Sequence, residues 1–108
     1  MERPEVVTDT AMILERIRRV LPQTVRVVLF GSRATGHARP DSDADLLIVA
    51  PGEGSRAERG ADVRMALLDF PYGFDILVVT PEDWLKLRSW GSSIVAAAER
   101  EGKVLYGA

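Results

Sequence analysis

Three short apolar runs, each bordered by glycine or proline, restrict most strongly how this chain can fold. They are Thr24–Phe30 (TVRVVLF), Asp43–Ala50 (DADLLIVA) and Gly73–Thr80 (GFDILVVT). Short runs rich in β-branched and apolar residues are typical of strands. Residues 55–70 separate the second run from the third, and a helix of that length is sufficient for a crossover between parallel strands. The pattern therefore predicts a small sheet with helices packed against it.

Two helices are expected before the third strand. The segment 9–21 predicts an amphipathic helix that Thr8 or Asp9 caps and that Pro22 ends. Its apolar stripe consists of Ile13, Ile17, Val20 and Leu21. Residues 55–70 suit a helix with one buried face. The apolar residues of this segment are Val63, Met65, Ala66, Leu67 and Leu68.

Two more helices are expected after the third strand. Thr80-Pro81 followed by two acidic residues is a strong helix start, and another helix begins at Ser92 or Ser93 and ends before Gly102. The final residues KVLYG suit a short edge strand. We therefore predict an α/β (α+β) fold, a small mixed β-sheet with helices packed mainly on one face.

Composition limits the class of protein. The chain has 108 residues, of which 46% are hydrophobic and 28% charged, so we expect a single globular domain spanning 1–108. No apolar run approaches the ~20 residues that cross a bilayer, and the charged start MERPEVVTDT is unlike a signal peptide, so we expect a cytoplasmic protein without membrane contact. The absence of cysteine excludes disulfides and thiol chemistry. A net charge of -2 argues against tight nucleic-acid binding.

The predicted topology gathers acidic residues at one edge of the sheet. Asp43 and Asp45 lie at the start of the second strand, and Asp75 lies near the start of the third. Parallel strands start at the same edge, and an antiparallel first strand would bring Gly31 and Ser32 there as well.

These residue types suit metal-assisted phosphoryl transfer. Asp43 and Asp45, two positions apart on a strand, point to the same face, where two like charges favour a cation such as Mg²⁺. Asp75 would complete a two-metal site, and Gly31-Ser32 would form an anion-binding turn. Acidic residues at a solvated strand entry and an ordinary strand-ending turn are the alternative interpretations.

The spacing between the Gly31-Ser32 turn and the acidic residues of the second strand resembles a known signature. Gly31-Ser32, ten intervening residues and Asp43-x-Asp45 resemble the G-S-x10-D-x-D signature of the DNA polymerase β-like nucleotidyltransferase superfamily. The stretch GSRATGHARPDSDADLLIV and the ending AAAEREGKVLYG are similar to its smallest members, the minimal nucleotidyltransferases (MNT). The resemblance covers nearly the whole chain and implies a palm-like nucleotidyltransferase fold.

The resemblance also implies roles for individual residues. Gly31 and Ser32 become the triphosphate-binding turn, and Asp43 and Asp45 the shared metal ligands. Asp75 becomes the third acid, which binds the metal nearest the nucleophile and helps take its proton. Two arginines inside the motif contact phosphates or, alternatively, form surface salt bridges: Arg33 and Arg39.

The implied reaction is Mg²⁺-dependent transfer of a nucleoside monophosphate, AMP from ATP, to a hydroxyl group. MNT proteins resemble antitoxins that pair with HEPN toxins, which implies a tyrosine of such a toxin as acceptor. Two alternatives stay open. The chain could be a non-catalytic antitoxin that neutralises its partner by contact, or a transferase that acts on a small molecule such as an aminoglycoside or on an RNA end.

Overall fold

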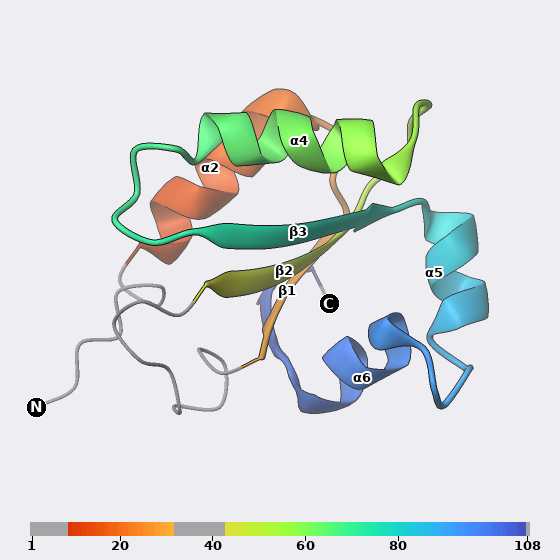
Figure 1. Ribbon diagram of the computed structural model, residues 1–108. Coiled ribbons are helices and arrows are strands. Elements are labelled where there is room, and N and C mark those ends of the chain that lie inside the picture. Colours follow the sequence, from red (N-terminus) through yellow and green to blue (C-terminus); the bar gives the residue numbers. More distant parts are fainter. Residues whose placement is uncertain (1–8, 32–42, 108) are drawn as a thin grey trace, which may run out of the picture.

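A four-stranded mixed sheet is the centre of the computed structural model, which describes residues 9–31 and 43–107. The strands are β1 (Arg26–Phe30), β2 (Ala44–Val49), β3 (Phe74–Val79) and β4 (Lys103–Tyr106). Their order across the sheet is β3-β2-β1-β4, of which Figure 1 labels the first three. β1 is antiparallel to both β2 and β4, whereas β2 and β3 are parallel. The predicted mixed sheet and its C-terminal edge strand are confirmed.

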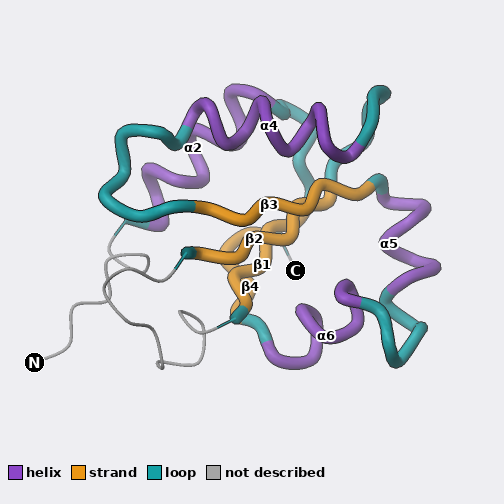
Figure 2. The backbone as a smooth tube through the Cα atoms, in the orientation of Figure 1, coloured by secondary structure: helices purple, strands orange, loops and turns teal. Residues whose placement is uncertain are grey.

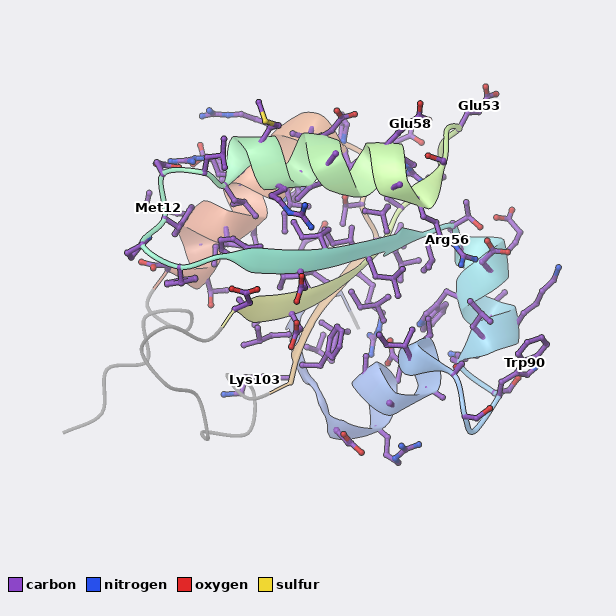
Figure 3. All side chains as sticks on the ribbon, in the orientation of Figure 1. Met12, Glu53, Arg56, Glu58, Trp90 and Lys103 are labelled. Carbon is purple, nitrogen blue, oxygen red and sulfur yellow. The ribbon has the colours of Figure 1, made fainter. Side chains whose placement is uncertain are left out.

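Helices lie against both faces of this sheet. They are α2 (Thr10–Val20), α4 (Arg56–Ala66), α5 (Pro81–Leu87) and α6 (Ile94–Glu101). The two longer ones, α2 and α4, share one face, and the shorter α5 and α6 lie by the other face (Figure 2). Arg56 at the start of α4 points toward α5, where its Nη2 lies 2.9 Å from Oδ2 of Asp83 (Figure 3).

Side-chain alternation along the strands divides the core into two layers. Val27, Leu46 and Phe74 face α2 and α4, and they pack with Ile13 and Ile17 of the predicted stripe. The neighbouring positions of the strands face α5 and α6, where Val95 and Ala98 cover them. The apolar residues of this second layer on the sheet are Val28, Leu47, Val49 and Val79. Asp45 lies two positions before Leu47 on β2, and Asp75 lies four positions before Val79 on β3. Both aspartates therefore point to the same face as these apolar residues.

Helix starts follow the capping residues that the sequence indicates. The Ser55 hydroxyl accepts from the backbone N–H of Glu58, whose side chain accepts from the backbone N–H of Ser55. The Thr80 and Ser93 hydroxyls cap α5 and α6 by accepting from the backbone N–H groups of Asp83 and Ala96. Asp9 holds the cap position of α2 but its carboxylate accepts from the Tyr72 hydroxyl at 2.9 Å instead. A contact distant in sequence therefore replaces the local cap.

The helix predicted over 55–70 is shorter than expected. It ends at Ala66, and the Leu67 N–H donates to the Arg64 carbonyl in a tighter turn. Leu67 is buried, but Met65 and Leu68 are 68% and 66% exposed. The chain leaves the helix early because Phe70, Tyr72 and Phe74 form an aromatic cluster beside the sheet. In the part of the chain that the structure describes, each helix falls short of the length and apolarity that spanning a bilayer requires.

Candidate active site

Asp45 and Asp75 lie side by side at the start of the two parallel strands. They are direct partners in the register of β2 and β3, and they point to the same face. Asp45 is half-buried and Asp75 is exposed. Burial raises the pKa of Asp45, and the charge of Asp75, a hydrogen bond with Asp75 and the charge of Asp43 raise it further. The sheet therefore brings together two of the acidic residues that the sequence predicted to converge.

Asp43 directly precedes β2 and lies close to the chain that enters β3. A Cβ atom on Gly73 would lie only 2.6 Å from Oδ1 of Asp43, so glycine at this position leaves room for the carboxylate. The Ala44 N–H donates to the Gly73 carbonyl at 2.9 Å, which joins the two strand entries. All three predicted acids therefore lie at one edge of the sheet, with the Asp43 side chain beside Gly73.

Gly31 ends β1 next to Asp45. Its φ of +79° lies in the left-handed region that favours glycine, and a Cβ atom there would collide with Oδ2 of Asp45. Phe30, the preceding residue, is the register partner of Asp45. The expectation that an antiparallel β1 would carry Gly31 to the edge with the acids is confirmed. Ser32, Arg33 and Arg39 lie outside the described residues, so their phosphate-binding roles stay predictions.

The donor set agrees with a magnesium site in its chemistry. Mg²⁺ takes one or two carboxylates and completes its shell with water and substrate phosphate, and Asp45 and Asp75 supply two hard oxygen ligands. Two neighbouring carboxylates repel each other, and this repulsion adds to the effect of burial in raising the pKa of Asp45. A divalent cation bound between them would relieve the repulsion. Within residues 9–31 and 43–107, no group of three acidic, histidine or cysteine side chains is arranged to hold a metal ion. Asp43 would have to turn from Gly73 to join the pair.

A pocket lies at the outer edge of β3, beside the acidic pair. Its volume is about 450 Å³, and both Asp43 and Asp75 line it. The remaining wall combines one cation with apolar and aromatic residues: Arg64, Leu67, Leu68, Tyr72, Gly73 and Phe74. Sequence reasoning missed this pocket because it assigned Leu67 and Leu68 to a continuous helix. The aromatic residues between that helix and β3 were the available signal.

Comparison with known proteins agrees with this geometry. No curated protein matches the chain. A solved toxin–antitoxin complex with AMP-PNP is 25% identical with a TM-score of 0.63, over 93% of this chain and 74% of that chain. The MntA–HepT toxin–antitoxin pair is 23% identical with a TM-score of 0.55, over 94% and 72%. The complex of tri-AMPylated Shewanella oneidensis HEPN toxin with MNT antitoxin is 19% identical with a TM-score of 0.53, over 94% and 71%. The last two likenesses show a shared fold.

The amino-acid sequence itself also matches the model of a known protein family. The model of the nucleotidyltransferase domain matches residues 11–95, which include β1, both strands that carry the acids, and α5. Because this match spans most of the sequence and contains the whole candidate site, the chain belongs to the nucleotidyltransferase domain family.

Proposed function

We propose that this nucleotidyltransferase transfers AMP from ATP to a tyrosine hydroxyl of a HEPN-type toxin and thereby acts as its antitoxin. The observation that carries the proposal is the contact of Asp45 with Asp75 beside the glycine that ends β1. One similar structure contains AMP-PNP with a toxin–antitoxin complex, and another contains an AMPylated HEPN toxin. These two relatives support the choice of nucleotide and partner.

Each residue of the site has a role in the proposed reaction. The acceptor oxygen bonds to the α-phosphorus of ATP while the bond to pyrophosphate breaks, and the hydroxyl proton passes to Asp75 or through it to water. Asp75 suits this role because it is exposed and lies on the edge strand. Asp45 and Asp43 would hold Mg²⁺ together with Asp75, and the bound ions would neutralise charge on the phosphates. Gly31, having no Cβ, lets the backbone approach the phosphates closely.

Mass spectrometry of the partner tests this proposal. The protein is incubated with Mg²⁺, ATP and the HEPN protein encoded with it, and the intact mass of the HEPN protein is measured. We expect a gain of one or more AMP units, located on tyrosine by fragmentation. Asp45→Asn should lower the rate by at least about a hundredfold, as loss of a main electrostatic stabiliser does.

Asp62→Asn is the matched control, because Asp62 is exposed on α4 outside the site. It should transfer AMP at the wild-type rate. A stable complex without any gain of mass would contradict the proposal and favour neutralisation by contact. Transfer to an aminoglycoside or to an RNA end, with none to the HEPN protein, would contradict the proposed acceptor.

A further inference from the structure

We infer that Lys103 binds the β- and γ-phosphates of ATP and neutralises charge on the pyrophosphate that leaves. The inference rests on the proposed function, since it assigns a residue to the leaving group of the same reaction. It adds a phosphate-binding residue on β4, a strand that carries none of the residues assigned to the site above.

The strand directions place Lys103 at the same edge of the sheet as the acidic pair. β1 is antiparallel to β2 and β4, so β1 ends where these two strands begin, and β3 begins there as well because it is parallel to β2. Lys103 is the first residue of β4 and the register partner of Leu29. Across this edge the residues therefore follow the order Asp75, Asp45, Gly31 and Lys103.

This order puts Lys103 on the side of the leaving group. Entering and leaving oxygens lie roughly in line on opposite sides of a transferred phosphoryl group. In the proposed reaction the acceptor proton passes to Asp75 on the outer strand β3, so the acceptor enters from that side and pyrophosphate leaves toward β1 and β4. Adjacent strands are ~4.8 Å apart, which puts β4 roughly 10 Å from β2. A triphosphate that begins at Asp45 and a lysine side chain that begins on β4 together span this distance.

The Lys103 side chain is available to a ligand. It is exposed and belongs to neither core layer, and Figure 3 shows it beside the end of β1, extending beyond the edge of the sheet. Its register partner Leu29 faces α2 and α4, but the exposed, flexible lysine stem is not held against that face. No residue that the structure describes forms an ion pair with Lys103.

The turn before Lys103 fixes where its side chain begins. Gly102 ends α6 by donating its N–H to the Ala98 carbonyl at 2.8 Å. A Cβ atom on Gly102 would lie 2.6 Å from Cγ1 of Val28 and 2.8 Å from the Leu29 carbonyl oxygen. The turn therefore lies directly against β1 because glycine has no side chain, and Lys103 starts beside the last residues of that strand.

A cation at this position suits the chemistry of the leaving group. When the bond between the α-phosphorus and the bridging oxygen breaks, its electron pair stays on the pyrophosphate. A lysine ammonium is a point charge that binds phosphate and stabilises such developing charge. Lysine on an edge strand also discourages pairing with another chain. That second role would change the oligomeric state of a variant but not its affinity for nucleotide.

Calorimetric titration with AMP-PNP and Mg²⁺ tests the inference without the HEPN protein. Lys103→Ala should bind AMP-PNP about tenfold more weakly, as expected for loss of a hydrogen bond to a charged group. Lys103→Arg keeps the cation and should retain most of the affinity. Lys86→Ala is the matched control, because Lys86 is the other lysine of the chain and is exposed on α5, which follows the opposite end of β3. Thermal unfolding of the three variants verifies that they fold.

Steady-state transfer to the intact HEPN protein separates the two sides of the reaction. Lys103→Ala should lower kcat/KM for ATP and leave the KM for the HEPN protein unchanged. Unchanged AMP-PNP affinity in Lys103→Ala, or an equal loss in Lys103→Arg, would overturn the inference while the proposed function stands. Absence of transfer by a wild-type protein whose AMP-PNP binding depends on Lys103 would overturn the proposed function alone. Absence of AMP-PNP binding by the wild type would overturn both.

Discussion

Gly31 and Asp45 restrain each other at the scale of single residues. In Gly31→Ala, the new methyl group would collide with Oδ2 of Asp45, and the residue would keep a left-handed φ that costs alanine about 1–3 kcal/mol. We expect lower stability in urea unfolding and AMP transfer reduced about a hundredfold, because Asp45 must move. Gly91→Ala is the matched control, since nothing lies within 4 Å of a Cβ atom there. Wild-type transfer by Gly31→Ala would show that the position of Asp45 is unimportant.

Asp45 also predicts a pH dependence. Its pKa is raised above the ordinary 3.8 by burial and then by Asp75 and Asp43, so the folded state binds its proton more tightly than the unfolded state. Its contribution to stability is therefore complete below 3.8 and is lost as the pH rises through the raised pKa.

Melting temperatures in EDTA measure this effect. Asp45→Asn should gain in melting temperature relative to the wild type as the pH is raised from 4 toward 7. The pKa values of Glu99 and Asp69 are lowered, so these residues stabilise the fold more as the pH rises. Both residues are present in the two proteins, so their effects cancel in the difference between the melting temperatures. A melting-temperature difference independent of pH would contradict the assignment.

At the scale of elements, Glu99 joins a strand to two helices. Its carboxylate accepts from Arg26 of β1 at 2.6 and 2.9 Å and from the Trp84 indole of α5 at 2.9 Å. The Arg26 and Glu99 side chains are only 13% and 18% exposed, so Glu99→Ala leaves a cation with little access to water. We expect a loss of about 3 kcal/mol in the free energy of unfolding.

Glu101→Ala provides the comparison for this element-scale prediction. Glu101 pairs with Arg100 at 3.5 Å, and both side chains are largely exposed. Such a pair contributes at most about 1 kcal/mol. Equal destabilisation of the two variants in urea unfolding would show that the contacts of Glu99 with β1 and α5 do not stabilise the fold.

At the scale of the whole molecule, α5 and α6 cover only part of one face of the sheet and leave the start of β3 exposed. Residues of α5 and α6 pack on Val28, Leu47, Val49 and Val79, while Asp75 at the start of β3 is exposed on the same face. Binding at this part of the sheet should therefore stabilise the folded state as a whole.

Adding magnesium tests whether binding at this part of the sheet stabilises the folded state. At a concentration a hundred times its Kd, Mg²⁺ should raise the free energy of unfolding of the wild type by about 2.7 kcal/mol, and EDTA should reverse the gain. Asp45→Asn should respond much less, because one carboxylate ligand is lost. Equal stabilisation of both proteins in calorimetry would place the magnesium elsewhere.

The sequence by itself determined the elements and which acidic residues meet at one edge of the sheet. Apolar runs bordered by glycine and proline predicted the strands, because strand formation follows a pattern that adjacent residues carry. The crossover helix predicted parallel strands, and that topology alone was enough to expect Asp75 beside Asp45. Capping by Thr80 was also predicted, and the last helix was expected to begin at Ser92 or Ser93, because a cap bonds within three residues.

Only the tertiary structure decided features that depend on residues far apart in the chain. The Asp9 carboxylate accepts from Tyr72 rather than from its own helix, and α4 ends at Ala66, just before the aromatic cluster that starts at Phe70. Leu68 consequently lies in the wall of a pocket instead of on a buried helix face. Local pattern predicts where a helix is favourable, but the packing of distant side chains decides where it ends and which surfaces stay open.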